Sequence, residues 1–206
     1  MIKVWDLPTR IYHWLQALLV AGLLGTGLNG GGSSLVHQIL GLMILLLLIW
    51  RVGWGLAGSE TSRFANFVRP IGPILAYLKG QGTPFVGHNP LGGLMVVAMI
   101  ALLLVQSVTG LMNSELIDGV GMFGRSAVRQ AEQIHAVAAE GIIAFVMLHL
   151  VAIAGYRLFG KGLLLAMITG RAKGNRQPKL ESHRKAALVF VASCGLVLAP
   201  VVLLMI

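Results

Sequence analysis

Residues 133–158 read QIHAVAAEGIIAFVMLHLVAIAGYRL, a stretch in which the charged residues are Glu140 and Arg157. An α-helix needs roughly 20 apolar residues to cross the hydrocarbon core of a bilayer. This stretch is longer than that, and it has no continuous polar face that would suit contact with water. It therefore predicts a membrane-spanning helix, and it carries two histidines, His135 and His149, within the apolar run.

The whole chain has the composition of a membrane protein. Of its 206 residues, 56% are hydrophobic and 11% are charged, and the mean hydropathy is +0.83. Soluble domains contain about 25% charged residues, so a cytosolic enzyme, a nucleic-acid reader and a disordered tail protein are excluded. The pattern predicts an all-α membrane protein with spans at 8–28, 35–56, 92–112, 133–158 and 186–206. Between the spans we expect a short interfacial helix at 71–78, an outer loop at 113–132, and a segment at 163–168 that extends or follows the fourth span.

The basic residues are distributed unevenly between the loops. Apart from Arg125 and Arg129, every Lys and Arg falls on the side that holds the N-terminus. Cytoplasmic loops carry the excess of basic residues in membrane proteins. We therefore expect a cytoplasmic N-terminus and a C-terminus on the opposite side, and we call these the inner and outer sides. The net charge of +9 then reflects topology and contact with membrane lipid, not binding to nucleic acid.

Four histidines lie inside or at the ends of apolar segments, where a polar side chain is costly and usually functional. His135 and His149 are 14 positions apart, so on a helix they differ by about 40° in direction and about 21 Å in depth. The direction of each span places His13 level with His149 near the inner side, and His37 level with His135 near the outer side. The sequence thus predicts two histidine pairs at two depths, although each histidine alone could instead hydrogen-bond a neighbouring helix.

Two opposed imidazoles suit the two axial positions of a haem iron, and two such pairs suit two stacked haems. Ligation by two histidines leaves no open position on iron, which favours electron transfer over oxygen binding. A zinc site would need further ligands, and a proton relay fits less well because about 21 Å separates the pairs. The single cysteine, Cys194, excludes an internal disulfide, a cysteine-ligated iron–sulfur cluster and a covalently attached c-type haem.

Three further residues fall at the same two depths when the 14-residue interval is applied to the first two spans. Gly27 lies at the outer depth and Arg51 at the inner depth, while Gly41 follows His37 by one turn on the same face. A glycine opposite a porphyrin lets the ring approach the backbone, and an arginine could pair with a haem propionate. The alternatives are that Gly27 ends its helix, Gly41 serves helix packing, and Arg51 reaches towards the inner surface as an anchor.

Other polar residues have simpler expected roles. Gln106, Thr109 and Asn113 share one face of the third span and are expected to hydrogen-bond neighbouring helices. His88 and His183 fall in inner loops, where we expect them to be solvated or interfacial.

Several short motifs accompany the histidines. The chain opens with VWDLPTRIYHW at residues 4–14, and the other motifs are Thr26-Gly27, His37 followed by Gly41 and RVGWG at 51–55, Thr109-Gly110, the His135/His149 pair, and MITGR at 167–171. Together these motifs resemble the bacterial cytochrome b561 family, which includes the b-type cytochrome subunits of nickel–iron hydrogenases. The resemblance covers roughly residues 3–173, and its specific parts are the opening motif and the spacing of the histidine pair.

The resemblance implies a four-helix transmembrane bundle at residues 1–173 that holds two b haems in the bacterial inner membrane, with a periplasmic C-terminus. His13 and His149 would be the axial ligands of the inner haem, and His37 and His135 those of the outer haem. The implied function is electron transfer between quinone and a partner redox protein such as a c-type cytochrome or a hydrogenase. The chain departs from this core in residues 174–206, a linker and fifth span that offer a docking surface or a dimer contact, so a homo-oligomer stays open.

Two alternatives to this function remain open at the level of sequence. Within the redox class, the chain could be a stand-alone quinol oxidase that passes electrons to oxygen or superoxide, so whether it is an enzyme in its own right is undecided. Outside that class, it could be a haem-free transporter or membrane anchor. Candidate positions for quinone are the inner end near Trp5, Arg10 and Arg51, or the outer end near Glu140, an intramembrane carboxylate that could equally hydrogen-bond a neighbouring helix.

Overall fold

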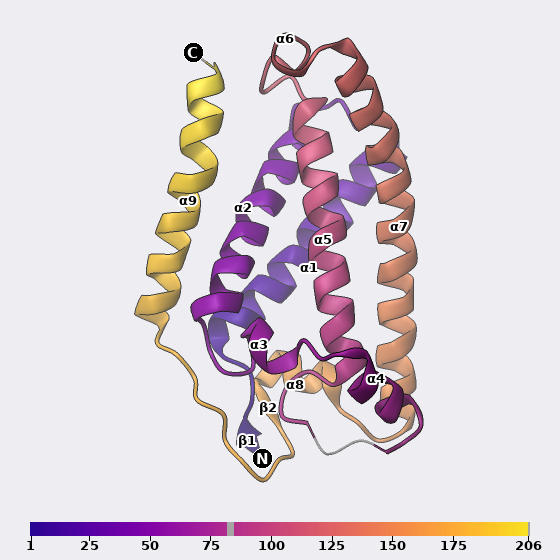
Figure 1. Ribbon diagram of the computed structural model, residues 1–206, viewed down its shortest axis with the longest axis vertical. Coiled ribbons are helices and arrows are strands. Elements are labelled where there is room, and N and C mark those ends of the chain that lie inside the picture. Colours follow the sequence, from indigo (N-terminus) through magenta and orange to yellow (C-terminus); the bar gives the residue numbers. More distant parts are fainter. Residues whose placement is uncertain (82–84, 206) are drawn as a thin grey trace.

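The computed structural model describes residues 1–81 and 85–205, which are mostly helical (Figure 1). Within these residues, five helices are long and apolar enough to cross a membrane. They are α1 (Leu7–Leu28), α2 (Leu35–Ala57), α5 (Pro90–Met112), α7 (Arg125–Leu158) and α9 (His183–Met205). The predicted all-α membrane fold with five spans is therefore confirmed.

Helices α1, α2, α5 and α7 form a bundle in which α2 packs against α1 and α5, and α5 packs against α7 (Figure 1). The centre of the bundle is filled by large apolar side chains. Ile44, Leu48 and Trp54 on α2 are at most 1% exposed, so α2 lies in the middle of the bundle between α1 and α5.

The fifth helix, α9, lies outside the bundle alongside α2 (Figure 1). A Cβ atom at Gly53 would come within 2.9 Å of Val189 Cγ1, so the glycine lets the two helices approach closely. The indole nitrogen of Trp50 donates a hydrogen bond to the Ala186 carbonyl at 3.2 Å. The fifth helix is thus attached mainly through one face of α2.

The outer segment between α5 and α7 differs from the predicted loop over 113–132. A short helix, α6 (Gly119–Phe123), lies within it, and α7 already begins at Arg125. Residues 125–132 read RSAVRQAE, whose Ala, Arg, Gln and Glu favour a helix. Because several of these residues are charged or polar, the length of the apolar run did not include them in the predicted span. Helix α7 has 34 residues, or about 51 Å of helix, so it projects beyond a hydrocarbon core of about 30 Å.

Short elements close the inner end of the bundle, where α1 begins. The short helix expected at 71–78 is present as α4 (Ile71–Leu78), and the segment after the fourth span is a separate helix, α8 (Leu163–Thr169). Gly160 has φ of +73°, a left-handed conformation that separates helix α7 from helix α8. The remaining elements are α3 (Phe64–Phe67) and a two-stranded antiparallel sheet of β1 (Ile2–Lys3) and β2 (Arg171–Ala172), which was not predicted.

Two motifs far apart in the sequence meet at this inner end. Gly170 has φ of +77°, and its carbonyl accepts a hydrogen bond from the Trp5 amide at 3.1 Å. The Arg10 guanidinium donates to the Met167 carbonyl at 3.2 Å. The segment after α7 therefore holds the start of α1 in place.

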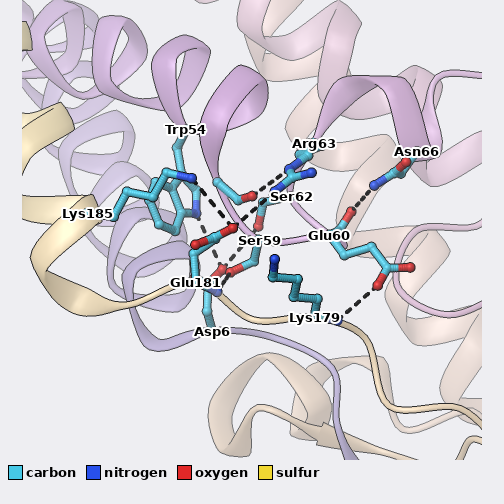
Figure 2. A network of polar contacts seen from close by, with 11 residues as sticks. Asp6, Trp54, Ser59, Glu60, Ser62, Arg63, Asn66, Lys179, Glu181 and Lys185 are labelled. Atoms are coloured by element: carbon cyan, nitrogen blue, oxygen red, sulfur yellow. Dashed lines mark hydrogen bonds and ion pairs between the residues drawn. The ribbon is translucent and has the colours of Figure 1, made fainter.

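Asp6 ties α1, α2 and the loop after α2 together (Figure 2). Its Oδ1 accepts a hydrogen bond from the Thr9 amide at 2.6 Å and so caps α1. Its Oδ2 accepts from Trp54 Nε1 and from Ser62 Oγ, both at 3.3 Å. A buried carboxylate is tolerated only when it is well hydrogen-bonded, and these three donors meet that requirement.

The linker before α9 is held by the same loop (Figure 2). The Glu181 carboxylate pairs with Arg63 at 3.1 Å, and the Glu181 amide donates to Ser59 Oγ at 2.9 Å. The Lys179 amide donates to the Glu60 carboxylate at 2.9 Å. These contacts place the start of α9 beside the end of α2.

Candidate functional site

His37 on α2 and His135 on α7 face each other near the outer end of the bundle. Their ring centres are 6.4 Å apart and their planes are inclined at 70°. Two imidazoles on opposite sides of one metal ion, with metal–nitrogen bonds of about 2 Å, have ring centres about 6 Å apart. The separation of this pair therefore suits a metal ion between the rings.

Hydrogen bonds hold both outer rings at Nδ1. His37 Nδ1 lies 2.7 Å from Thr26 Oγ1 on α1. His135 Nδ1 lies 3.0 Å from the Gln106 carbonyl and 3.2 Å from Thr109 Oγ1, both on α5. The outer pair consequently connects all four helices of the bundle.

A cavity of about 390 Å³ lies beside the outer rings, and Gly27 and Gly41 are among the residues that line it. Cofactor sites typically have volumes of roughly 300–1,000 Å³. A Cβ at Gly110 would lie 2.8 Å from His135 Cε1, so a side chain at this position would collide with the ring. A Cβ at Gly27 would make an ordinary contact with His37, and a Cβ at Gly41 would meet nothing within 4 Å. Gly27 and Gly41 thus border open space, whereas Gly110 is needed to seat an imidazole.

The inner pair consists of His13 on α1 and His149 on α7, with ring centres 6.3 Å apart and planes inclined at 51°. The pairing by depth is therefore found at both levels, while the role of these rings as ligands stays a prediction. Among the described residues, His13 Nδ1, the Tyr12 hydroxyl and Gln16 Oε1 are buried without a hydrogen-bond partner. Such atoms are rare in folded proteins, so the described part of the protein leaves several polar groups at the start of α1 unsatisfied.

Arg51 lies close to the inner end and is 2% exposed, so it is not the surface anchor that the sequence left open. Its Nη1 donates to the Ser62 carbonyl at 3.2 Å, and its guanidinium lies 5.1 Å from the centre of the Phe64 ring and 5.8 Å from that of Phe67. Within residues 1–81 and 85–205, no carboxylate forms an ion pair with it. The buried Asp6 carboxylate acts on this charge through space but forms no ion pair with it. A buried cation is costly without a direct partner, so the position favours an anionic group beside Arg51.

The ring of His88 is enclosed by side chains, so the expectation that this histidine is solvated is wrong, while an interfacial position stays a prediction. Its ring packs 4.7 Å from Trp5 and 4.5 Å from Phe67, centre to centre. Burial disfavours the charged ring, and the nearby positive charge of Arg51 disfavours it further, so the pKa of His88 is lowered to about 3. His183, by contrast, is exposed at the first residue of α9.

Among the polar side chains that the structure describes on the third and fourth spans, that of Thr109 bonds to another helix, whereas those of Asn113, Gln106 and Glu140 do not. Thr109 contacts His135 on α7, as the prediction of interhelical bonds requires. Asn113 instead donates to the Thr109 carbonyl within its own helix, and Gln106 Oε1 is buried without a partner among the described residues. Glu140 is exposed on α7 and does not line the cavity.

The residues that the structure describes contain no group of three or more His, Cys, Asp or Glu that could hold a metal ion. A metal here would therefore rest on pairs of imidazoles, which is the protein donor set of a haem with two axial histidines. The sequence profile of prokaryotic cytochrome b561 matches residues 4–170. The chain belongs to the prokaryotic cytochrome b561 family.

A relative of this cytochrome from Rhizobium leguminosarum bv. viciae bears the name "Probable Ni/Fe-hydrogenase B-type cytochrome subunit". The two sequences are 26% identical over an alignment of 212 positions, which covers 82% of this chain and 87% of the relative. No solved structure matches the chain. Membership in the family implies haem b as the cofactor and transmembrane electron transfer as the activity. The family match ends before α9 begins.

Sequence reasoning gave no role to Thr26 or Gly110, although the structure places both against a histidine ring. The available signal was the Thr-Gly pair, which recurs near the outer ends of α1 and α5. The sequence could not show that each pair faces an imidazole, because that depends on how helices far apart in the chain pack together.

We predict that His88 makes the cytochrome less stable in acid. Its pKa is about 3 in the folded chain and about 6.5 when unfolded, so between these values the unfolded chain binds a proton that the folded chain does not. The free energy of unfolding should then fall by about 1.4 kcal/mol for each pH unit below about 6.5. Denaturant unfolding in detergent should show a shallower decline for His88→Gln.

The matched control is His183→Gln, which changes an exposed histidine and should keep the slope of the unmodified chain. An identical slope in His88→Gln and the unmodified chain would contradict this account of His88.

Proposed function

We propose that this cytochrome holds two b haems and carries electrons across the membrane between the quinone pool and a partner redox protein. The observation that carries the proposal is the presence of two facing histidine pairs, with ring centres 6.3 Å and 6.4 Å apart, at two depths of one bundle. The two members on α7 differ in depth by about 21 Å, which is most of a hydrocarbon core of about 30 Å. Two haems at these levels would connect the two faces of the membrane.

In this proposal His13 and His149 hold the inner haem, and His37 and His135 hold the outer one. Iron with two axial imidazoles has no open coordination position, and it supplies the exchange of one electron between its ferric and ferrous states. The chain's own contribution is to hold the opposed rings on separate helices, and to exclude water with the apolar core around Ile44.

The residues around the rings complete the proposed sites. Gly27 and Gly41 border open space beside the outer pair, which suits a flat macrocycle. Arg51 is a buried cation at the inner end, where it would pair with a haem propionate.

The arrangement in the membrane is part of the same proposal. The concentration of Lys and Arg at the end where α1 begins supports a cytoplasmic N-terminus and a periplasmic C-terminus in a bacterial inner membrane. The relative's name, a hydrogenase cytochrome subunit, supports a hydrogenase as partner, and a c-type cytochrome is the other partner that the proposal admits. We assign haem binding to residues 1–173. We assign residues 174–206, whose helix α9 packs against α2, to a linker and a fifth span that add a further surface within the membrane.

We predict that His149→Ala removes one haem and spares the other. The substitution deletes an axial ligand from the inner pair alone, so the haem content of purified chain should fall by about half, and His37→Ala should remove the other haem. The measurement is the haem-to-protein ratio together with the reduced-minus-oxidised spectrum. His183→Ala is the control and should keep both haems, whereas loss of both or neither in His149→Ala would show that the pairing of ligands is wrong.

We also predict that Arg51→Gln lowers the reduction potential of the inner haem. Removing a buried positive charge next to a haem favours the ferric state, which carries one more positive charge than the ferrous state. A potentiometric titration should show this shift in one haem only. Arg63→Gln, which removes a more exposed charge at the same end, is the control and should leave both reduction potentials unchanged. An equal shift in the reduction potentials of both haems in Arg51→Gln would show that Arg51 does not lie beside the inner haem alone.

A further inference from the structure

The hydrogen bonds of the outer pair determine which ring nitrogen carries the proton. His135 Nδ1 lies 3.0 Å from the Gln106 carbonyl oxygen. A carbonyl can only accept a hydrogen bond, so Nδ1 of His135 must be the protonated nitrogen. Nε2 then keeps its lone pair and is the nitrogen available to a metal.

The same assignment follows for His37 from the bonds of Thr26. A threonine hydroxyl has a single proton, and Thr26 Oγ1 lies 2.9 Å from the Gly22 carbonyl in its own helix. That carbonyl can only accept, so the hydroxyl donates to it and accepts a hydrogen bond from His37 Nδ1 at 2.7 Å. Thr109 repeats the arrangement, because its Oγ1 donates to the Val105 carbonyl at 2.8 Å.

The inner pair lacks this support. Among the described residues, His13 Nδ1 is buried with no hydrogen-bond partner. The two histidine pairs have nearly the same ring separation, so ring separation does not distinguish them, whereas the hydrogen bonds at Nδ1 do.

We propose that Thr26 and Thr109 are positioning residues that hold His37 and His135 with a protonated Nδ1, and that this makes the outer haem the one with the lower reduction potential. The inference rests on the proposed function, because it requires a haem between these rings. A hydrogen bond from Nδ1–H raises the basicity of a ligating imidazole. A more basic ligand stabilises ferric over ferrous iron, and both rings of the outer pair are hydrogen-bonded at Nδ1.

The test is a potentiometric titration of the purified full-length chain carrying Thr26→Val. Valine keeps the shape of threonine but cannot accept the hydrogen bond, so the reduction potential of the outer haem should rise while that of the inner haem stays unchanged. Thr26→Ser restores the hydroxyl and should restore the potential. Thr109→Val should have a smaller effect, because His135 still has the Gln106 carbonyl as acceptor.

Ser193→Ala on α9 is the matched control. The Ser193 hydroxyl donates to the Val189 carbonyl at 2.8 Å as Thr26 does to Gly22, but α9 carries neither pair, so its removal should move neither potential. Loss of the outer haem alone in Thr26→Val would also support the proposal.

Three results would overturn the inference: equal movement of both potentials, an unmoved outer potential, or failure of Thr26→Ser to restore it. Loss of both haems in Thr26→Val would overturn it as well. These outcomes are distinct from failure of the proposed function, which would appear as an unmodified chain that binds no haem.

Discussion

A polar side chain inside a lipid bilayer is costly unless its polar atoms find partners, and the outer histidine pair meets this requirement through bonds that join the bundle. His37 and His135 come from different helices, and each is tied at Nδ1 to a further helix through Thr26, Thr109 and the Gln106 carbonyl. All four helices are thereby joined at one level. The second nitrogen of each ring is left for a group between the rings, and separations of 6.3 Å and 6.4 Å suit an iron atom in that position.

At the inner end, where α1 begins and α7 ends, a second set of polar contacts holds the helices together. Asp6 caps α1 and accepts hydrogen bonds from Trp54 and Ser62, while Glu181 ties the linker to Arg63 (Figure 2). The fifth helix is held by this linker and by one face of α2. The family match ends before α9, so the helix lies outside the part of the chain that the family profile covers.

The spans and the pairing of histidines could be read from the sequence, because both depend on periodicity along single helices. Apolar length located the five spans, and helix rise and rotation placed His13 with His149 and His37 with His135. The early start of α7 was missed, since residues 125–132 are polar but helical. Thr26 and Gly110 were missed as well, because their contacts depend on how neighbouring helices rotate against each other. His88 was predicted to be solvated or interfacial because it lies in a loop, yet Trp5 and Phe67 enclose its ring and exclude the first of these.

The haem-to-protein ratio of the purified, unmodified chain tests the central claim most directly. A b-type spectrum with two haems for each chain is the result that two opposed histidine pairs require. A ratio of one, or a colourless preparation, would contradict the account, since one or both pairs would then serve only to pack the helices.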